Sequence, residues 1–139
     1  MDTKFAVALH SLIFISESAE PTTSDKISET LNTNASYVRR ILSSLVKAGL
    51  ITSASKTRGC GLLKEPKAIL LSDVYDAVEP GVSKLNMSIS QNPNTDLFLC
   101  QCEKPVMEKL FEEMESSVDA ILSGRTLQHL IDSIKRRQE

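Results

Sequence analysis

The sequence lacks the residue patterns on which most enzyme active sites depend. Its three cysteines form no C-x-x-C motif, its two histidines stand in no recognisable Cys–His context, and its five glycines form no phosphate-binding loop. We therefore expect no catalytic residues and a protein that is not an enzyme. The odd number of cysteines also argues against a framework of structural disulfides, so the thiols are expected to be reduced.

The chain also has no apolar run long enough to cross a membrane. The longest, FAVALHSLIFI, is interrupted by His10 and Ser11, whereas a spanning helix needs about 20 apolar residues. A basic leader with a cleavage site is missing too, so we expect a cytoplasmic protein with no membrane partner. With 139 residues, 41% of them hydrophobic, the chain can bury one core, which predicts one compact domain with an extension.

Positive charge is in deficit overall, but its distribution is uneven. The net charge is −2. Residues 1–70 carry nine Lys and Arg against six Asp and Glu, a net charge of +3, whereas residues 71–139 carry seven against twelve, a net charge of −5. The first half is therefore the candidate for binding nucleic acid, and the acidic half must have another role.

A helix with one basic face is predicted directly after Asn34. Asn34 is a good N-cap, and the apolar residues that follow have the i, i+3, i+4, i+7 spacing of a buried stripe: Val38, Ile41, Leu42 and Leu45. The opposite face and its flanks are polar, basic and free of carboxylates: Ser36, Tyr37, Arg39, Arg40, Ser43 and Lys47. Such a face suits the major groove of DNA, although a merely solvated face is the ordinary alternative for an isolated helix.

The neighbouring segments favour the DNA-binding interpretation. Upstream, Thr22 with Asp25 fits a capping box that opens a short helix, and an NTN turn then leads into the basic helix, as in a helix-turn-helix. Downstream, Gly49 fits a left-handed helix end, and residues 51–54 and 61–64 can pair as strands around a basic tip. The predicted DNA contacts come from both helices and this wing: Thr22, Ser24, Asn34, Ser36, Tyr37, Arg39, Arg40, Ser43, Lys56 and Arg58.

The run TTSDKISETLNTNASYVRRILSSLVKAGLITS, followed by RGCGLLKEPKAILLSDVYDAVE, resembles the Rrf2 family of bacterial transcription regulators. The resemblance covers the first 80 residues well and the C-terminal helix weakly. It rests on the start of the basic helix, its aliphatic pair, its ending and the following helix: Tyr37–Val38, Ile41–Leu42, Lys47–Leu50 and Leu71–Glu79. It implies a mainly α fold with a small β-wing. The domains would be a winged helix-turn-helix over 1–80, a sensor or connecting loop over 81–101 and dimerisation helices over 102–139.

A single long helix is predicted between Cys102 and Leu122. Its apolar residues are spaced 4, 3, 4, 3, which predicts a helix-pairing seam: Met107, Phe111, Met114, Val118 and Ile121, broadened by Leu110 and Leu122. The seam could pack on the chain's own domain, as most amphipathic helices do. We favour a homodimer interface, because a small winged helix has little surface to cover so long a stripe and because two-fold DNA sites need two-fold proteins. The resemblance implies the same role for this helix.

The cysteines depart from the pattern that the resemblance implies. In the best-known branch of the family, three cysteines in the loop hold an iron–sulfur cluster, whereas this loop offers only Cys100 and Cys102. Thiolate-held clusters normally need four ligands, so no cluster is expected. A zinc site is equally poor, because no further Cys or His is nearby in the sequence. We therefore expect no metal and no cofactor.

Thiol chemistry remains, and Cys102 is the candidate sensor. It lies at the expected start of the long helix, with Pro105 in the first turn and Lys104 close by, and both the free N–H groups and the lysine favour the thiolate. A buried structural cysteine is an equally good interpretation, and it suits Cys100 better. Cys60 is expected to be exposed at the wing tip, far from any part that moves the DNA-binding units.

These patterns predict a dimeric repressor that binds a near-palindromic double-stranded DNA operator. Modification of Cys102 by an oxidant, or by an electrophile such as a quinone, would switch its DNA binding. The alternative is a regulator of the same family that is gated at the same loop by a protein partner or a small ligand.

Overall fold

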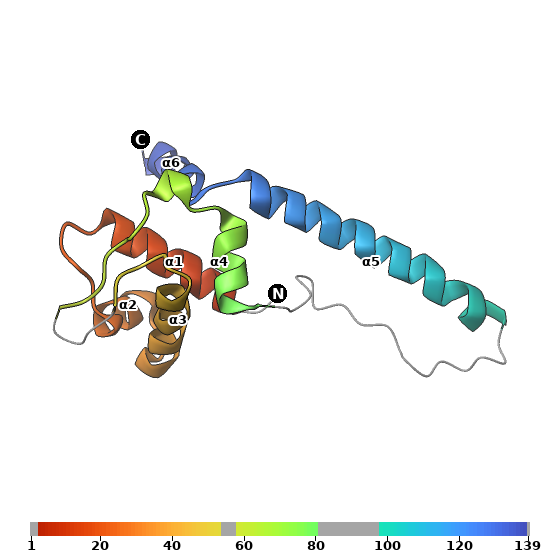
Figure 1. Cartoon of the computed structure of the whole chain (residues 1–139), viewed down its shortest axis with the longest axis horizontal. Helices are drawn as coiled ribbons and strands as arrows, with labels where there is room; N and C mark the ends of the chain where they lie inside the picture. The colour runs from red at the N-terminus through yellow and green to blue at the C-terminus, as the bar shows by residue number, and fades with distance from the viewer. Residues whose placement is uncertain (1–2, 54–57, 81–97, 139) are drawn as a thin grey trace.

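The computed structural model describes residues 3–53, 58–80 and 98–138. The chain forms a small helical domain from which one long helix extends (Figure 1). The elements in chain order are α1 (Thr3–Glu17), α2 (Ser24–Leu31), α3 (Ala35–Lys47), a 3-10 turn η1 (Pro66–Ala68), α4 (Leu71–Val78), α5 (Phe98–Gly124) and α6 (Leu127–Gln138). This is the mainly helical fold with little strand that the sequence predicts.

The core lies where α1 packs against α3, α4 and α6. All six α-helices contribute fully or nearly fully buried apolar side chains, among them Leu12, Ile27, Leu42, Val74, Leu122 and Ile131. The rings of Phe5 and Tyr75 meet edge to face, with centroids 5.4 Å apart, and this contact joins α1 to α4. The core therefore covers the apolar face of α3 and leaves its polar face exposed to solvent.

Helices α2 and α3 form the predicted helix-turn-helix. The cap of α2 is Thr23, whose hydroxyl accepts a hydrogen bond from the Lys26 amide at 3.2 Å, so the expected capping box at Thr22 was wrong by one residue. Asn32 ends α2 in the left-handed region, with φ of 52°, which reverses the chain within the turn. The predicted cap of α3 is confirmed, since Asn34 Oδ1 accepts from the amides of Ser36 at 2.7 Å and Tyr37 at 3.3 Å.

In its described residues the wing contains less strand than the two four-residue strands expected, and Ala54 lies outside those residues. Gly49, with φ of +76°, ends α3 as predicted, and Ile51 then pairs with Leu62 in a single antiparallel bridge. The second arm changes partner, because Cys60 pairs with Thr22 instead of continuing along the first arm. Two backbone hydrogen bonds of 2.8 and 3.0 Å join Cys60 to Thr22, so the wing is attached to the segment that leads into α2.

Helix α5 starts earlier than the sequence suggested. It begins at Phe98, so residues 98–101, which were assigned to the connecting loop, are helical, and residues 81–97 lie outside the described part. Pro105 was expected in the first turn but is the eighth residue of this 27-residue helix. Packing of α5 on α4, with Leu122 in the core, anchors its carboxyl end. No helix in the described ranges is long and apolar enough to cross a membrane.

Candidate nucleic-acid interface

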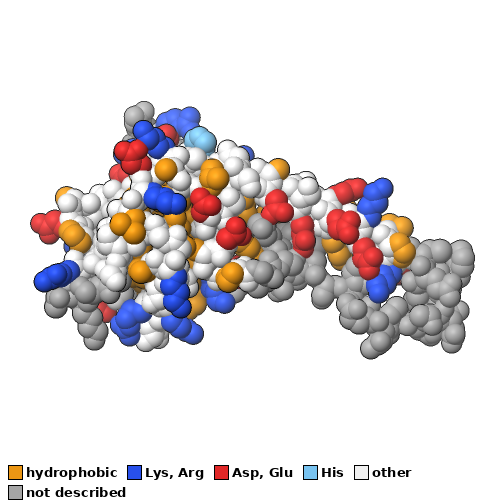
Figure 2. All heavy atoms as spheres, viewed as in Figure 1, with side chains coloured by type: hydrophobic (Ala, Val, Ile, Leu, Met, Phe, Trp, Pro, Cys, Tyr) orange, Lys and Arg blue, Asp and Glu red, His pale blue; other side chains and the backbone are white. Residues whose placement is uncertain are grey.

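The solvent face of α3 has the composition predicted for a DNA-binding surface. Ser36, Arg39, Arg40, Ser43 and Lys47 are all exposed, while Val38, Ile41, Leu42 and Leu45 are buried. Figure 2 shows Lys and Arg side chains gathered along the edge of the domain where α3 lies, and Asp and Glu side chains along α5. The separation of charge seen in the sequence is thus also a separation in space.

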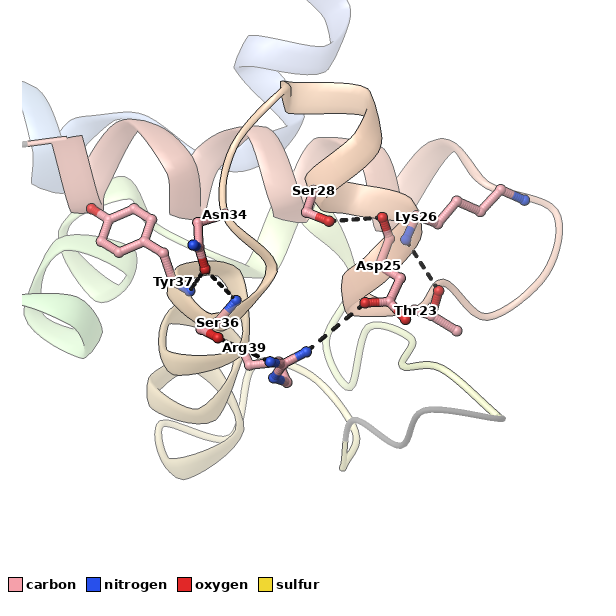
Figure 3. Close-up of polar contacts among 8 residues, drawn as sticks. All are labelled: Thr23, Asp25, Lys26, Ser28, Asn34, Ser36, Tyr37 and Arg39. Carbon is pink, nitrogen blue, oxygen red and sulfur yellow. Dashed lines mark hydrogen bonds and ion pairs between the residues drawn. The ribbon is translucent and has the colours of Figure 1, made fainter.

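Arg39 is held in place by neighbours from both helices of the motif (Figure 3). Its Nη2 donates a hydrogen bond to Ser36 Oγ at 3.0 Å, and its Nη1 lies 3.9 Å from Asp25 Oδ1. Asp25 stands in the first turn of α2. The guanidinium therefore lies across the junction of α2 and α3 and remains accessible, because 45% of the Arg39 side chain is exposed.

Tyr37 connects the basic face to α1. Its hydroxyl is 2.9 Å from Thr3 Oγ1, and the guanidinium carbon of Arg40 lies 5.7 Å from the centroid of its ring. At this distance the ring attracts the cation and restricts its position. Tyr37 therefore restricts the position of Arg40 on the polar face, and Tyr37 itself is half-buried.

The other predicted contact residues differ in their exposure to solvent. Thr22 and Ser24 are buried, with 2% and 7% of their surfaces exposed, which argues against DNA contacts through their side chains. Thr22 is covered because it pairs with Cys60 of the wing. Asn34 is exposed, but its oxygen already caps α3. Arg58 is exposed on the wing, and Lys56 lies outside the described residues.

Cys60 is buried, not exposed at the wing tip as expected. Only 1% of its surface is accessible, and its thiol donates to the Thr22 carbonyl oxygen at 3.3 Å. Burial raises the pKa of this thiol, because the charged thiolate is poorly solvated there. Cys60 is thus a structural cysteine that keeps its proton at neutral pH.

The burial of Cys60 also affects whether it could serve as a ligand of the iron–sulfur cluster found in the best-known branch of the family that the sequence resembles. Cys60 has its thiol turned to Thr22 and sealed from solvent, so it does not suit a third ligand beside Cys100 and Cys102. Those two cysteines belong to the first two turns of α5, and their side chains lie outside the description. Within the described part of the chain, no group of three or more His, Cys, Asp or Glu side chains could hold a metal ion.

The predicted pairing seam of α5 is only partly accurate. Leu110, Met114 and Ile121 are exposed, by 50%, 38% and 50%, whereas Met107, Phe111 and Val118 are half-buried. Leu122, which was expected to broaden the seam, is buried in the core of its own domain. Val106, 70% exposed and not predicted, extends the open face, which we call the apolar stripe of α5: Val106, Leu110, Met114 and Ile121. Next to it lies a hollow of about 370 Å³ lined by Leu110, Glu113, Met114, Ser117 and Val118.

Two residues that support the basic face could not be identified from the sequence. Thr3 and Asp25 hold Tyr37 and Arg39, yet they lie 34 and 14 positions away from them in the chain. No sequence spacing points to such pairs, because the approach of the helices creates them. Thr23, the true cap of α2, was missed for a simpler reason, since Thr22 and Thr23 are equally good caps by residue type.

Comparisons with known proteins agree with this geometry. Residues 1–133 match the Rrf2 family model, which is described as an iron-dependent transcriptional regulator. The chain is 30% identical over 134 residues to YwnA of Bacillus subtilis (strain 168), named as an HTH-type transcriptional regulator, and the match covers 96% of this chain and 98% of YwnA.

Solved structures show the same fold. CymR, the global cysteine regulator of B. subtilis, superposes with a TM-score of 0.70 at 23% identity and covers 95% of both chains. T. potens IscR superposes with a TM-score of 0.74 at 18% identity, over 100% of this chain and 90% of IscR. With nearly the whole chain matched by the family model and by YwnA, the protein belongs to the Rrf2 family of DNA-binding transcription regulators and is not an enzyme.

Proposed function

We propose that the protein is a homodimeric repressor that binds a near-palindromic operator through the exposed face of α3. The observation that carries this proposal is the basic, carboxylate-free face of α3, presented by a helix-turn-helix on a buried apolar core. Arg40 and Ser43 occupy the centre of this face, where a helix in the major groove meets base edges. A protein that binds chromosomal DNA in a bacterium acts in the cytoplasm.

The apolar stripe of α5 supports the dimer. Helix α5 has 27 residues and is therefore about 40 Å long, and among the described residues it is the carboxyl end that packs on the domain. Three large side chains of the stripe are half-exposed or more, and burial of such a side chain stabilises by about 1.5–3 kcal/mol. A second copy of α5 would cover this stripe and place two α3 helices on one DNA duplex.

Sedimentation velocity tests the dimer. Leu110→Glu places a charge in the middle of the stripe and should give a monomer at micromolar concentration, while Ser116→Glu, on the opposite face of α5, should leave a dimer. The monomeric variant should also bind operator weakly, because each half-site alone supplies few contacts. A wild-type protein that sediments as a monomer at this concentration would refute the dimer.

DNA binding is tested with two arginines that have different expected roles. Arg40→Ala should cost about 1–3 kcal/mol of operator binding and relax specificity if Arg40 contacts a base. Arg58→Ala on the wing should weaken binding to all sequences and flatten the salt dependence, because a phosphate contact carries no sequence information. Unchanged affinities for both variants would refute the assignment of this surface.

We further propose that the switch is a thiol near the start of α5, with Cys102 as the reacting residue and without an iron–sulfur cluster. Two facts support the location: Cys60 is sealed in the core, and α5 carries both other cysteines at the end that does not pack on α4. Cys102 is the fifth residue of α5 and not its first, so the free N–H groups of the helix start lie closer to Cys100 than expected. Both cysteines therefore enter the test.

The test combines mass spectrometry with DNA affinity after exposure to peroxide, hypochlorite, persulfide and a quinone. Cys102→Ser should bind DNA normally and fail to respond, whereas Cys60→Ser and Cys100→Ser should still respond. A fully inducible Cys102→Ser with an unresponsive Cys100→Ser would move the switch to Cys100. If both variants remain inducible, gating by a protein partner or a small ligand takes the place of the thiol switch.

A further inference from the structure

The ion pair between Asp25 and Arg39 places a carboxylate on the surface that is proposed to face DNA. We propose that Asp25 is a specificity-determining residue: it positions Arg39 along α3 and disfavours binding to DNA that offers only phosphates. This inference rests on the proposed DNA-binding function. Asp25 belongs to α2 and lies outside the basic face of α3.

The geometry restricts Arg39 from two sides. Ser36 Oγ accepts from Nη2 at 3.0 Å within α3, and Asp25 Oδ1 lies 3.9 Å from Nη1 across the helix junction (Figure 3). Both acceptors belong to the first turns of their helices. The guanidinium is therefore aligned along the amino end of α3, which is the part of a recognition helix that contacts base edges.

The other arginine of α3 is held differently. Arg40 lies over the Tyr37 ring, and no carboxylate pairs with it among the residues the structure describes. It can turn to a phosphate without leaving an anion behind. The two neighbouring arginines thus differ in the presence of a carboxylate partner.

Asp25 affects the two kinds of DNA unequally. To bond a phosphate, Arg39 must leave the carboxylate, and the carboxylate itself is repelled by the phosphate backbone. Both effects weaken binding to every duplex. On the operator these two effects are offset, because Asp25 holds Arg39 in place for two directed hydrogen bonds to a guanine edge, and only the operator provides that edge in the correct position. Removal of the charge should therefore help random DNA more than the operator.

The experiment measures affinity for two duplexes of equal length and composition: one selected in vitro from a random pool with the wild-type protein, and a scrambled version of it. Asp25→Asn should bind the scrambled duplex about two- to fivefold more tightly, because the pair it removes is exposed and weak, and should gain little or nothing on the selected duplex. The ratio of the two affinities should fall accordingly. Higher salt should reduce the difference between variant and wild type.

Asp132→Asn is the matched control. It makes the same chemical change and the same change in net charge on α6, at the end of the domain away from α3 (Figure 1). Its affinity ratio should equal that of the wild type. Urea unfolding of both variants checks that they are folded, since Asp25 also stabilises the first turn of α2.

A third variant separates positioning from simple repulsion. If Asp25 acts through Arg39, the effect of Asp25→Asn on the ratio should vanish in an Arg39→Ala background. Persistence of the full effect in that background, or an unchanged ratio in Asp25→Asn alone, would overturn the inference. These outcomes differ from a failure of the proposed function, in which the wild-type protein itself would not discriminate between the two duplexes.

Discussion

Substitution of Gly59 by alanine is expected to damage the attachment of the wing more than any other glycine substitution among the described residues. Gly59 has φ of +73°, and a Cβ added there would lie 2.7–2.8 Å from the backbone N, C and O atoms of Thr22. A backbone cannot move aside as a flexible side chain can. Gly49 has a similar φ of +76° but open space around its Cβ position, and Gly61 has open space without a positive φ.

Comparison of the three variants separates the cost of a left-handed backbone from the cost of losing the hydrogen bonds to Thr22. Gly49→Ala should lower the free energy of unfolding by about 1–2 kcal/mol, the cost of a left-handed backbone for a residue with a Cβ. Gly59→Ala adds the loss of the two backbone hydrogen bonds between Thr22 and Cys60, at about 0.5–1.5 kcal/mol each, for a total of about 2–5 kcal/mol. Gly61→Ala should be neutral or stabilise by up to about 1 kcal/mol, because it restricts only the unfolded chain.

Urea unfolding followed by far-UV circular dichroism measures these differences. The three variants and the wild type must be compared at one protein concentration, because association would add to the apparent stability. The slopes of the unfolding transitions should agree if only stability changes. A Gly59→Ala variant no less stable than Gly49→Ala would refute the close approach of Gly59 to Thr22 and, with it, the attachment of the wing described above.

Three further predictions follow from the caps, the core and the buried thiol. Asn34→Ala should lower the free energy of unfolding by about 1 kcal/mol, measured in urea, since it removes the acceptor for two amides of α3. Leu122→Ala should cost about 2–5 kcal/mol in a monomeric Leu110→Glu background, whereas Ile121→Ala in the same background should cost much less because half of Ile121 is exposed. The raised pKa of Cys60 means that the unfolded chain releases this proton first as pH rises, so stability should decline above the ordinary thiol value of 9.0. Cys60→Ala should show a smaller decline over the same pH range, and an equal decline would exclude the thiol as its cause.

Much of the DNA-binding half could be predicted from the sequence, because its signals are local. The stripe of Val38, Ile41, Leu42 and Leu45 has helical spacing and is buried as predicted, and Asn34 and Gly49 mark the two ends of α3. A helix with one apolar face is buried on that face. The prediction of the helix therefore also predicts which of its side chains are exposed. The family followed from the same residues.

Properties that depend on distant segments required the tertiary structure. Cys60 stands between two glycines in a segment that suits an exposed turn, yet its pairing with Thr22, 38 positions earlier, buries it and raises the pKa of its thiol. The same pairing removes Thr22 from the surface. Likewise, the repeat along α5 showed that the helix has an apolar face, but only the packing on α4 decides that Leu122 belongs to the core while Leu110 stays open. Helical periodicity specifies which side chains share a face, whereas the partner that covers each part of that face depends on how the rest of the chain folds against it.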